Sequence, residues 1–590
     1  MKKNYLLIFL AIGLSNFQVI FAQLMLKEVS LKTQIENSSL VVEGKVISQK
    51  SFWDAENKHI YTSNTIYVYK VFKGETLATI EVITPGGTVG LSAEIVSPSL
   101  KLNNGDLGVF TLYNSNVVMK LNEKSSIKQY KPYGSSQGFY KYNLYDNVAV
   151  NTFNKKQGIA SAFYNEIMSY TKSNYIELSD FTVQSTLLKS SQSKVALVPG
   201  SITFTPTTST AGTKSILTIN GTGFGSTKGK VSFRNADDGG ATFVDALNTQ
   251  ILTWNNTQIT VEIPSEAGTG QIMVTDASAS SAMSSSILTI TYSEINVTQE
   301  GGTVAYRIQH ANENSSGGYT LQMFTDFNNN ANAKAAFLRA FDTWRCTTGI
   351  NWIIGATTTV DVADSDGVNV IRFDNGAELG PNELGRCTYY LSGCGTGTNL
   401  NWFVAGLDVV FDDATNWNYS SATNSTGISQ YDFESNVLHE LGHGHMLGHV
   451  INTNDVMNYA ISNSEEQRVL GASNITAANA IQSRSTSSMV CAQPLMTNHP
   501  CSLGVEEEEL NAAINIYPNP SNGQFYVKNT GLVNLDKVVV YDLRGRLVSQ
   551  FDMSNASRTK TINLLGASKG MYFVKIVSDR AEITKKILID

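Results

Sequence analysis

Charged residues are scarce in this chain of 590 residues, and long hydrophobic runs are missing from it after the N-terminus. Charged residues make up 16% of the sequence, below the usual fraction of about 25%. The net charge is -7, so no basic surface indicates binding to nucleic acid. A transmembrane helix needs about 20 apolar residues in a row, and no such run follows the N-terminal segment. The sequence therefore favours neither a nucleic-acid-binding protein nor an integral membrane protein.

Cysteine is also scarce, and its distribution is uneven. The five cysteines are Cys346, Cys387, Cys394, Cys491 and Cys501. In an oxidising compartment they are candidates for disulfides. We prefer the pairs Cys387–Cys394 and Cys491–Cys501, which close short loops and leave Cys346 free, although other pairings stay open. Zinc binding by cysteine is the weaker alternative, because no C-x-x-C spacing occurs.

The N-terminus has the pattern of a secretory signal. Lys2 and Lys3 precede an apolar run over residues 5–14, and the small residue Ala22 ends the segment. We therefore expect residues 1–22 to be a signal peptide and the mature protein to be exported and soluble.

Histidine is rare but concentrated. The chain has 7 histidines, and four of them lie between His439 and His449. His439-Glu440-Leu441-Gly442-His443 has the spacing H-E-x-x-H. On a helix, His439 and His443 project from one face about one turn apart, which lets two imidazoles bind one zinc ion. Glu440 lies beside them, where it can reach a metal-bound water.

The helix that carries this motif is amphipathic and capped. Asp432 is the predicted N-cap. Phe433, Val437 and Leu441 follow at i, i+4 and i+8 and form an apolar stripe on roughly the opposite side from the two histidines. The sequence thus predicts one buried face and one face that holds a metal.

A third ligand requires the chain to leave the helix. His449 follows His443 by six residues, so a continuing helix would point it away from the metal. His445 is the competing candidate, although it also faces away if the helix runs on. Eight residues after Leu447 come Asp455 to Tyr459, with a methionine in their centre.

These features together resemble the metzincin zinc peptidases, whose pattern is H-E-x-x-H-x-x-G-x-x-H followed by a methionine turn. The sequence from Asp432 to His443 is most similar to that of the matrixin branch. Met446 stands where the family has glycine. It would cost roughly 1–2 kcal/mol in a left-handed conformation, unless Gly444 or Gly448 makes the turn.

The resemblance implies the remaining roles. Zn²⁺ would be held by His439, His443 and His449 and would activate a water, with Glu440 as the general base. Met457 would pack beneath the metal. Tyr459 has the spacing of the astacin and serralysin branches, where this tyrosine binds zinc or stabilises the oxyanion; a buried structural tyrosine is the alternative. The cysteine-switch latency of matrixins has no candidate residue, because no cysteine precedes Cys346.

Two β-rich modules precede the zinc motif. Residues 23–190 alternate apolar and polar positions, as in 41–47 and 65–71, which predicts a β-domain; we assign it no function. Residues 199–293 contain the Gly-rich stretch 217–225, Trp254 and the alternating segment 259–264. With these features they resemble an IPT/TIG domain, an immunoglobulin-like sandwich.

The segment 296–502 predicts an α+β domain. We expect a helix over Ala335–Trp344 that stops at Gly349, and strands over 368–373 and 407–411. In the metzincin family a strand like 407–411 forms the edge of the cleft, where an extended peptide adds as a further strand. Four aspartates are candidate Ca²⁺ ligands, although turn residues are the better interpretation because none fits an EF-hand. They are Asp326, Asp361, Asp364 and Asp366.

An acidic run over Glu506–Glu509 separates the C-terminal module. After it come Ile516-Tyr517-Pro518-Asn519-Pro520 and the strand-like segments 538–546 and 570–576. With these features residues 511–590 resemble the C-terminal sorting domain of type IX secretion substrates in Bacteroidetes. The resemblance implies the type IX machinery as a partner, and a location at the cell surface or outside the cell.

The fold class predicted is therefore multidomain: two N-terminal all-β domains, an α+β metzincin-like domain and a C-terminal all-β domain. The function predicted is a secreted zinc metalloendopeptidase acting on proteins or peptides. The alternative is a surface adhesin or binding protein with an inactive peptidase-like domain. The presence of Glu440 beside three candidate ligands favours the enzyme.

Overall fold

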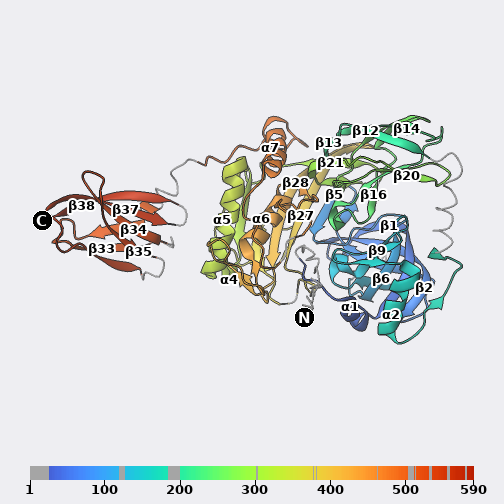
Figure 1. The fold of residues 1–590 in the computed structure, drawn as a ribbon, viewed down its shortest axis with the longest axis horizontal. Helices are drawn as coiled ribbons and strands as arrows, with labels where there is room; N and C mark the ends of the chain where they lie inside the picture. The colour runs from blue at the N-terminus through green and yellow to red at the C-terminus, as the bar shows by residue number, and fades with distance from the viewer. Residues whose placement is uncertain are drawn as a thin grey trace, which may run out of the picture. The chain divides into compact units, whose positions relative to one another are not determined.

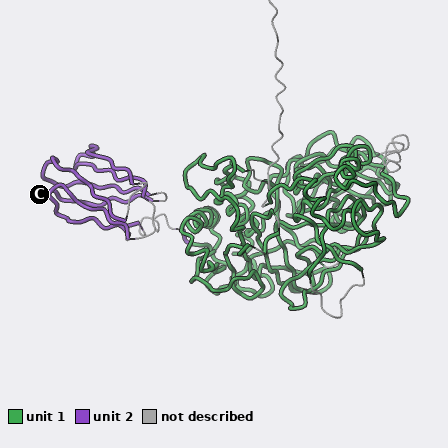
Figure 2. Tube along the Cα trace, turned by 90° about the horizontal axis from the view of Figure 1, so that it is seen from below, with its two compact units in different colours: residues 1–499 green, residues 500–590 purple. Residues whose placement is uncertain are grey.

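The computed structural model of the chain forms two compact units, residues 1–499 and residues 500–590 (Figure 2). It describes residues 26–117, 127–183, 199–299, 303–376, 378–380, 382–460, 463–501, 510–511, 513–530, 535–553, 558–578 and 581–590. The predicted signal peptide 1–22 and the acidic run Glu506–Glu509 lie outside the described residues. Within the described residues, no helix has the length and apolar character needed to cross a membrane.

The first module is a closed β-barrel. Its strands follow the order β1 (Leu40–Trp53), β2 (Ile60–Lys73), β3 (Thr79–Pro85), β7 (Gln129–Pro132) and β6 (Leu107–Asn114), and β6 pairs back with β1. The predicted strands 41–47 and 65–71 fall within β1 and β2 and are confirmed. Only β3 and β7 run parallel among these pairs. This order is that of an OB-fold type of barrel.

Further elements flank the barrel. They are α1 (Leu31–Asn37), η2 (Ser135–Gly138), β8 (Phe139–Asn143), β9 (Val148–Val150), β10 (Lys155–Gln157), η3 (Ile159–Phe163), α2 (Tyr164–Thr171) and β11 (Ile176–Glu177). Between β3 and β6 the chain also forms a hairpin of β4 (Gly87–Val89) and β5 (Ser92–Ser97), which belongs to a different sheet.

The second module is a β-sandwich around a shared apolar core. One sheet has the order β12 (Gly200–Thr205), β14 (Ile216–Thr222), β18 (Gln258–Glu262) and β17 (Ile251–Trp254). The other has the order β16 (Phe243–Asp245), β15 (Lys230–Arg234), β19 (Met273–Thr275) and β20 (Ser281–Met283). A short turn, η5 (Ala236–Asp238), follows β15. Strand β13 (Thr208–Ala211) pairs with the last strand, β21 (Thr289–Glu294).

The third module packs helices on a mixed sheet. The strand order is β25 (Trp352–Ile354), β24 (Tyr319–Met323), β26 (Asn369–Phe373), β28 (Asn399–Phe411) and β27 (Gly385–Thr396). The helices are α4 (Thr325–Asn329), α5 (Ala331–Thr348), α6 (Phe433–Gly444) and α7 (Ala472–Ser487), and the short strands are β22 (Asn296–Thr298), β23 (Ala305–Gln309), β29 (Trp417–Asn418), β30 (Tyr431–Asp432) and β31 (Leu447–Gly448).

Helix α5 is the predicted helix 335–344, extended at both ends. Phe337, Phe341 and Trp344 are fully buried, so the predicted apolar face is confirmed. Gly349 has φ 74° and donates its N–H to the carbonyl of Arg345, which ends the helix as expected. Helix α5 lies against α6 (Figure 1), and the Trp344 indole N–H donates to the carbonyl of Leu438 at 2.7 Å.

The prediction that strand 407–411 forms the sheet edge is wrong. This segment is the end of β28, which lies between β26 and β27. Strand β27 is the last strand that the third module contributes, and β5 of the first module pairs with it antiparallel over six positions, from Cys387↔Ser97 to Ser392↔Ser92. The sheet therefore continues into the first module (Figure 1). Sequence alone did not reveal a pairing between segments almost 300 residues apart.

The preferred disulfide pairing is also wrong. Cys394 is bonded to Cys491, with a Cα–Cα distance of 5.5 Å, and Cys387 is a buried free thiol. Both Cys387 and Cys394 lie on the extended strand β27. Seven residues of strand span roughly 23 Å, far beyond the reach of a disulfide. Cys346 is disulfide-bonded and not free, and so is Cys501.

The second unit is a separate β-sandwich with its own core. One sheet has the order β32 (Ile514–Tyr517), β33 (Gln524–Asn529) and β36 (Thr559–Asn563), and the other β35 (Leu547–Asp552), β34 (Leu535–Asp542), β37 (Gly570–Ser578) and β38 (Glu582–Ile589). The β-character predicted for residues 511–590 is confirmed.

Candidate metal centre

Helix α6 carries the first two candidate ligands. Asp432 is its N-cap, as predicted, and its side chain accepts the N–H of Ser435 at 2.9 Å. Phe433, Val437 and Leu441 pack into the core of the module. All 12 residues of the helix are buried. The helix is thus fixed on every side, which holds His439 and His443 in one geometry.

Both of these histidines are oriented by backbone carbonyl groups. The Nδ1 atom of His439 lies 2.7 Å from the carbonyl oxygen of Val456, and that of His443 lies 2.8 Å from the carbonyl oxygen of Leu447. A carbonyl only accepts hydrogen bonds, so each Nδ1 carries the proton. The lone pair of each ring is then on Nε2, the atom left to bind a metal.

Met446 makes the turn that follows the helix. Its φ is 64°, whereas Gly444 and Gly448, both in the described part of the chain, do not have positive φ. The Met446 N–H donates to the carbonyl of His443 at 2.6 Å, and its own carbonyl accepts the N–H of Ile295 at 2.8 Å. Since a left-handed residue other than glycine is strained, the contact with Ile295 helps to hold this conformation.

The turn returns His449 to the first two histidines, but its partner comes from another module. The His449 Nδ1 lies 2.7 Å from a carboxylate oxygen of Asp237, which follows strand β15 of the second module. Burial opposes ionisation of Asp237, but the hydrogen bond with His449 and the charge of Lys101 outweigh it and lower the pKa of Asp237 to about 2. Sequence reasoning missed Asp237, which lies 212 residues away.

The three histidines form one group of potential ligands. One nitrogen of each ring lies within 4.8 Å of the others, and the ring centroids are 4.7, 4.8 and 5.4 Å apart. The Nε2 atoms of His443 and His449 are buried and have no hydrogen-bond partner among the described residues. Buried, unpartnered nitrogens are costly unless a ligand satisfies them. This donor set therefore fits zinc, which favours imidazole ligands.

The electrostatic environment also suits a metal. Burial, with the nearby His449, lowers the pKa of His439 to about 3. Burial and the other two histidines lower the pKa of His443 well below its ordinary value. Both rings are therefore neutral near pH 7, as ligands must be.

Glu440 is buried beside this group. Neither of its carboxylate oxygens has a hydrogen-bond partner within the described parts of the chain, and burial raises its pKa well above the ordinary value. Strand β27 passes nearby, since the charge of Glu440 adds to the burial that raises the pKa of Cys387. Glu440 thus lies near strand β27, the strand with which β5 pairs.

His445, the competing ligand, points elsewhere. Its Nε2 lies 2.9 Å from the hydroxyl of Thr348. Its ring packs between Trp344 and Trp352, with centroid distances of 5.4 and 5.5 Å, and also against His310. His445 is part of the hydrophobic core and not of the histidine group.

Met457 packs against helix α6, and Tyr459 lies against the second module. A Cβ built on Gly442 would lie 2.3 Å from the Met457 sulfur, so the methionine packs directly beneath α6. The hydroxyl of Tyr459 lies against the second module, because a Cβ on Gly239 would lie 2.5 Å from it.

The four aspartates considered for Ca²⁺ do not assemble. Among the described residues, the acidic group with ligand spacing consists instead of Asp374, Asp412 and Asp413. Calcium binding by the chain stays a prediction.

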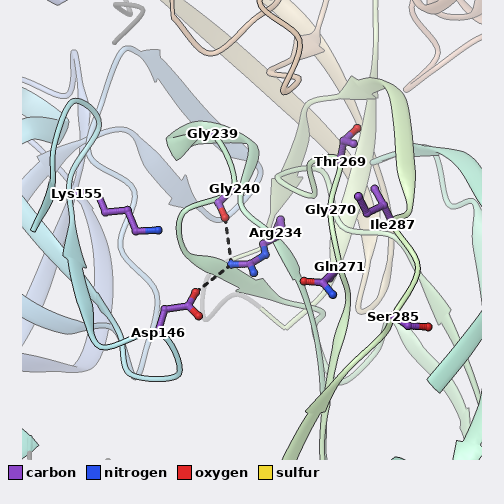
Figure 3. A pocket seen from close by; sticks show the side chains of 10 residues that line it. All are labelled: Asp146, Lys155, Arg234, Gly239, Gly240, Thr269, Gly270, Gln271, Ser285 and Ile287. Carbon is purple, nitrogen blue, oxygen red and sulfur yellow. Dashed lines mark hydrogen bonds and ion pairs between the residues drawn. The ribbon is translucent and has the colours of Figure 1, made fainter. Parts of the chain in front are cut away.

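A pocket lies between the first two modules, and its lining residues include none of the three histidines. It has a volume of about 390 Å³. Asp146 pairs with Arg234 across it at 3.6 Å, and Arg234 also donates to the carbonyl of Gly240 (Figure 3). Gly239 and Gly240 thus have this pocket on one side and Tyr459 and Ile451 on the other.

Three family models match the chain. The model described as Matrixin matches residues 309–482, which contain the histidine group. The chain contains a matrixin domain. The IPT/TIG model matches residues 199–292 and the secretion system C-terminal sorting domain matches residues 515–590, in the order predicted. The matrixin domain supports assignment of the chain as a metallopeptidase. The sorting domain implies export by type IX secretion to the cell surface or outside the cell.

Single proteins add little to these matches. No curated protein matches the chain. Among solved structures, a DUF3244 family protein with an immunoglobulin-like β-sandwich fold from Bacteroides vulgatus is 17% identical. That match covers 14% of this chain and 87% of the other, with a TM-score of 0.13.

Proposed function

We propose that the protein is a secreted zinc endopeptidase whose metal is held by His439, His443 and His449. The observation that supports it best is the convergence of three buried imidazoles beside an unpartnered buried glutamate, inside a matrixin domain. Zinc bound there would supply a Lewis acid and an acidified water.

The chain itself supplies the proton transfer and the orientation. A carboxylate oxygen of Glu440 takes the proton from the attacking water and passes it to the leaving amine. The carbonyls of Val456 and Leu447 keep two ligand rings in one tautomer. Tyr459 stays a candidate for stabilising the oxyanion.

The substrate class follows from strand β27, which flanks Glu440. An extended peptide can bind by adding to a sheet edge, and β5 uses this edge by pairing antiparallel with β27. We propose that a substrate peptide takes the place of β5, so the structure represents a closed state. A binding protein with an inactive peptidase domain is the alternative.

The test uses the full chain and the isosteric variant Glu440→Gln. We expect about one zinc per chain, and loss of peptide hydrolysis on chelation. Glu440→Gln should retain zinc while hydrolysis falls by at least ~100-fold, the usual range for removal of a general base. Hydrolysis that resists the chelator, or that survives Glu440→Gln, would contradict the mechanism. Zinc binding without hydrolysis by any form of the chain would favour the binding protein.

A further inference from the structure

The loop that follows β15 is built so that one of its two adjacent aspartates points outward. Asp238 is engaged within the loop, where it accepts the N–H groups of Ala241 and Thr242 at 2.9 and 3.2 Å. The side chain of Asn235 accepts the N–H of Asp237 at 3.1 Å. The backbone of Asp237 is therefore fixed by its own loop, while its carboxylate reaches His449 in the matrixin domain.

Contacts on two sides hold this loop against the ligand-bearing turn. Strand β21 of the IPT/TIG domain pairs antiparallel with β31 of the turn, with Ser293 opposite Gly448. Ile451, two residues after His449, packs against Gly240 and Gly268, where an added Cβ would lie 3.1 and 2.5 Å from its Cδ1. Because the two domains meet on both sides of His449, the distance between Asp237 and the imidazole is set by packing and not by a flexible side chain alone.

We propose that Asp237 of the IPT/TIG domain is a positioning residue of the metal centre, which orients His449 and completes the site from outside the matrixin domain. The inference rests on the proposed function. By accepting the Nδ1 proton, the carboxylate fixes the ring in the tautomer and orientation that keep Nε2 free for the metal. The Nε2 of His449 is buried and has no partner among the described residues, as a ligand atom would be before metal binds.

The nature of the partner distinguishes His449 from the other two ligands. His439 and His443 are oriented by neutral carbonyl groups of their own domain. Only His449 has an anionic partner among the three. A carboxylate offsets part of the metal's positive charge, so its loss should weaken metal binding more than the loss of a neutral acceptor of the same shape.

The test measures zinc affinity in the full chain by competition with a chromophoric chelator. Asp237→Ala should bind zinc ~10–100-fold more weakly, the usual effect of removing such a partner. Asp237→Asn, which keeps an acceptor oxygen without the charge, should fall between Asp237→Ala and the parent chain. Asp245→Asn is the matched control, because Asp245 lies in the same domain and pairs with Lys230. It should bind zinc like the parent chain.

A spectroscopic readout separates positioning from general damage. With Co²⁺ in place of zinc, Asp237→Ala should shift the visible ligand-field bands, while thermal unfolding of the metal-free chain stays close to that of the parent. Zinc affinity and Co²⁺ spectrum equal to the parent in Asp237→Ala would overturn the inference. So would an equal loss in Asp245→Asn. Failure of the parent chain itself to bind zinc would instead overturn the proposed function, and His439→Ala in the same assay gives the value expected for an abolished site.

Discussion

The two halves of the histidine group are built from different parts of the molecule. Helix α6 places His439 and His443, and both rings are oriented by carbonyl groups of the matrixin domain. His449 instead has its contacts in the second module, because Asp237 is bonded to its ring and β21 pairs with its turn. We call His439 and His443 the helical half of the group, because contacts close in sequence place them. We call His449 the tertiary half, because contacts between domains surround it. The environment of His449 is therefore complete only when the matrixin domain and the IPT/TIG domain are packed together.

The same division holds along the sheet. The matrixin domain supplies β27, but β5, from the barrel module, covers its edge. The modules that precede the matrixin domain therefore act in two opposite ways: one supports the proposed ligand His449, and the other occupies the edge at which we propose that a peptide binds. Variants directed at His449 and at the pairing of β5 with β27 can separate these two effects.

The largest effect expected comes from breaking the tertiary half at its ligand. His449→Phe should lower zinc affinity by at least ~100-fold and abolish hydrolysis, because two histidines rarely hold zinc without a third protein ligand. His445→Phe is the matched control. A phenyl ring fits between Trp344 and Trp352, where His445 now lies, so this variant should keep its metal. Metal content by mass spectrometry of the native protein gives the comparison, and loss of zinc from His445→Phe alone would reverse our assignment.

The helical half was predictable from sequence because its signals are short-range. The N-cap Asp432, the stripe from Phe433 to Leu441 and the spacing of the two histidines all lie within one helix. The tertiary half was only partly predictable. The resemblance placed His449 in the site, but neither Asp237 nor the pairing of β5 with β27 leaves a local pattern. The strand 407–411 was identified as a strand but assigned to the wrong position, since sheet order depends on segments far apart in the chain.

The second effect tests whether β5 has to leave β27. Ser92 and Ser392 lie directly opposite each other in the two strands, at a spacing of about 4.5–5.5 Å that a disulfide can bridge. The double variant Ser92→Cys, Ser392→Cys should therefore form a disulfide that fixes β5 in place. We expect peptide hydrolysis by the oxidised form to be at least ~10-fold slower than by the reduced form, because the edge stays covered.

The parent chain in the same reductant is the control, since it contains its own disulfide between Cys394 and Cys491. Equal rates for the oxidised and reduced double variant would show that a peptide reaches the site without displacing β5.

The smallest effect concerns the turn that joins the two halves. Met446 has φ 64° and its side chain is fully buried in the core. A substitution therefore changes the free energy of unfolding in two opposing ways, through lost packing of the side chain and through relief of backbone strain. Met446→Ala removes the buried side chain but keeps a Cβ in the left-handed region, and should cost ~2–5 kcal/mol in the free energy of unfolding. Met446→Gly loses the same contacts but relieves the backbone strain of ~1–2 kcal/mol. Met446→Gly should therefore be more stable than Met446→Ala by about 1 kcal/mol, the reverse of the usual order of glycine and alanine in a folded chain.

Denaturant unfolding of the two variants measures this difference in the free energy of unfolding directly. If Met446→Ala is the more stable variant, the backbone is not strained at this position.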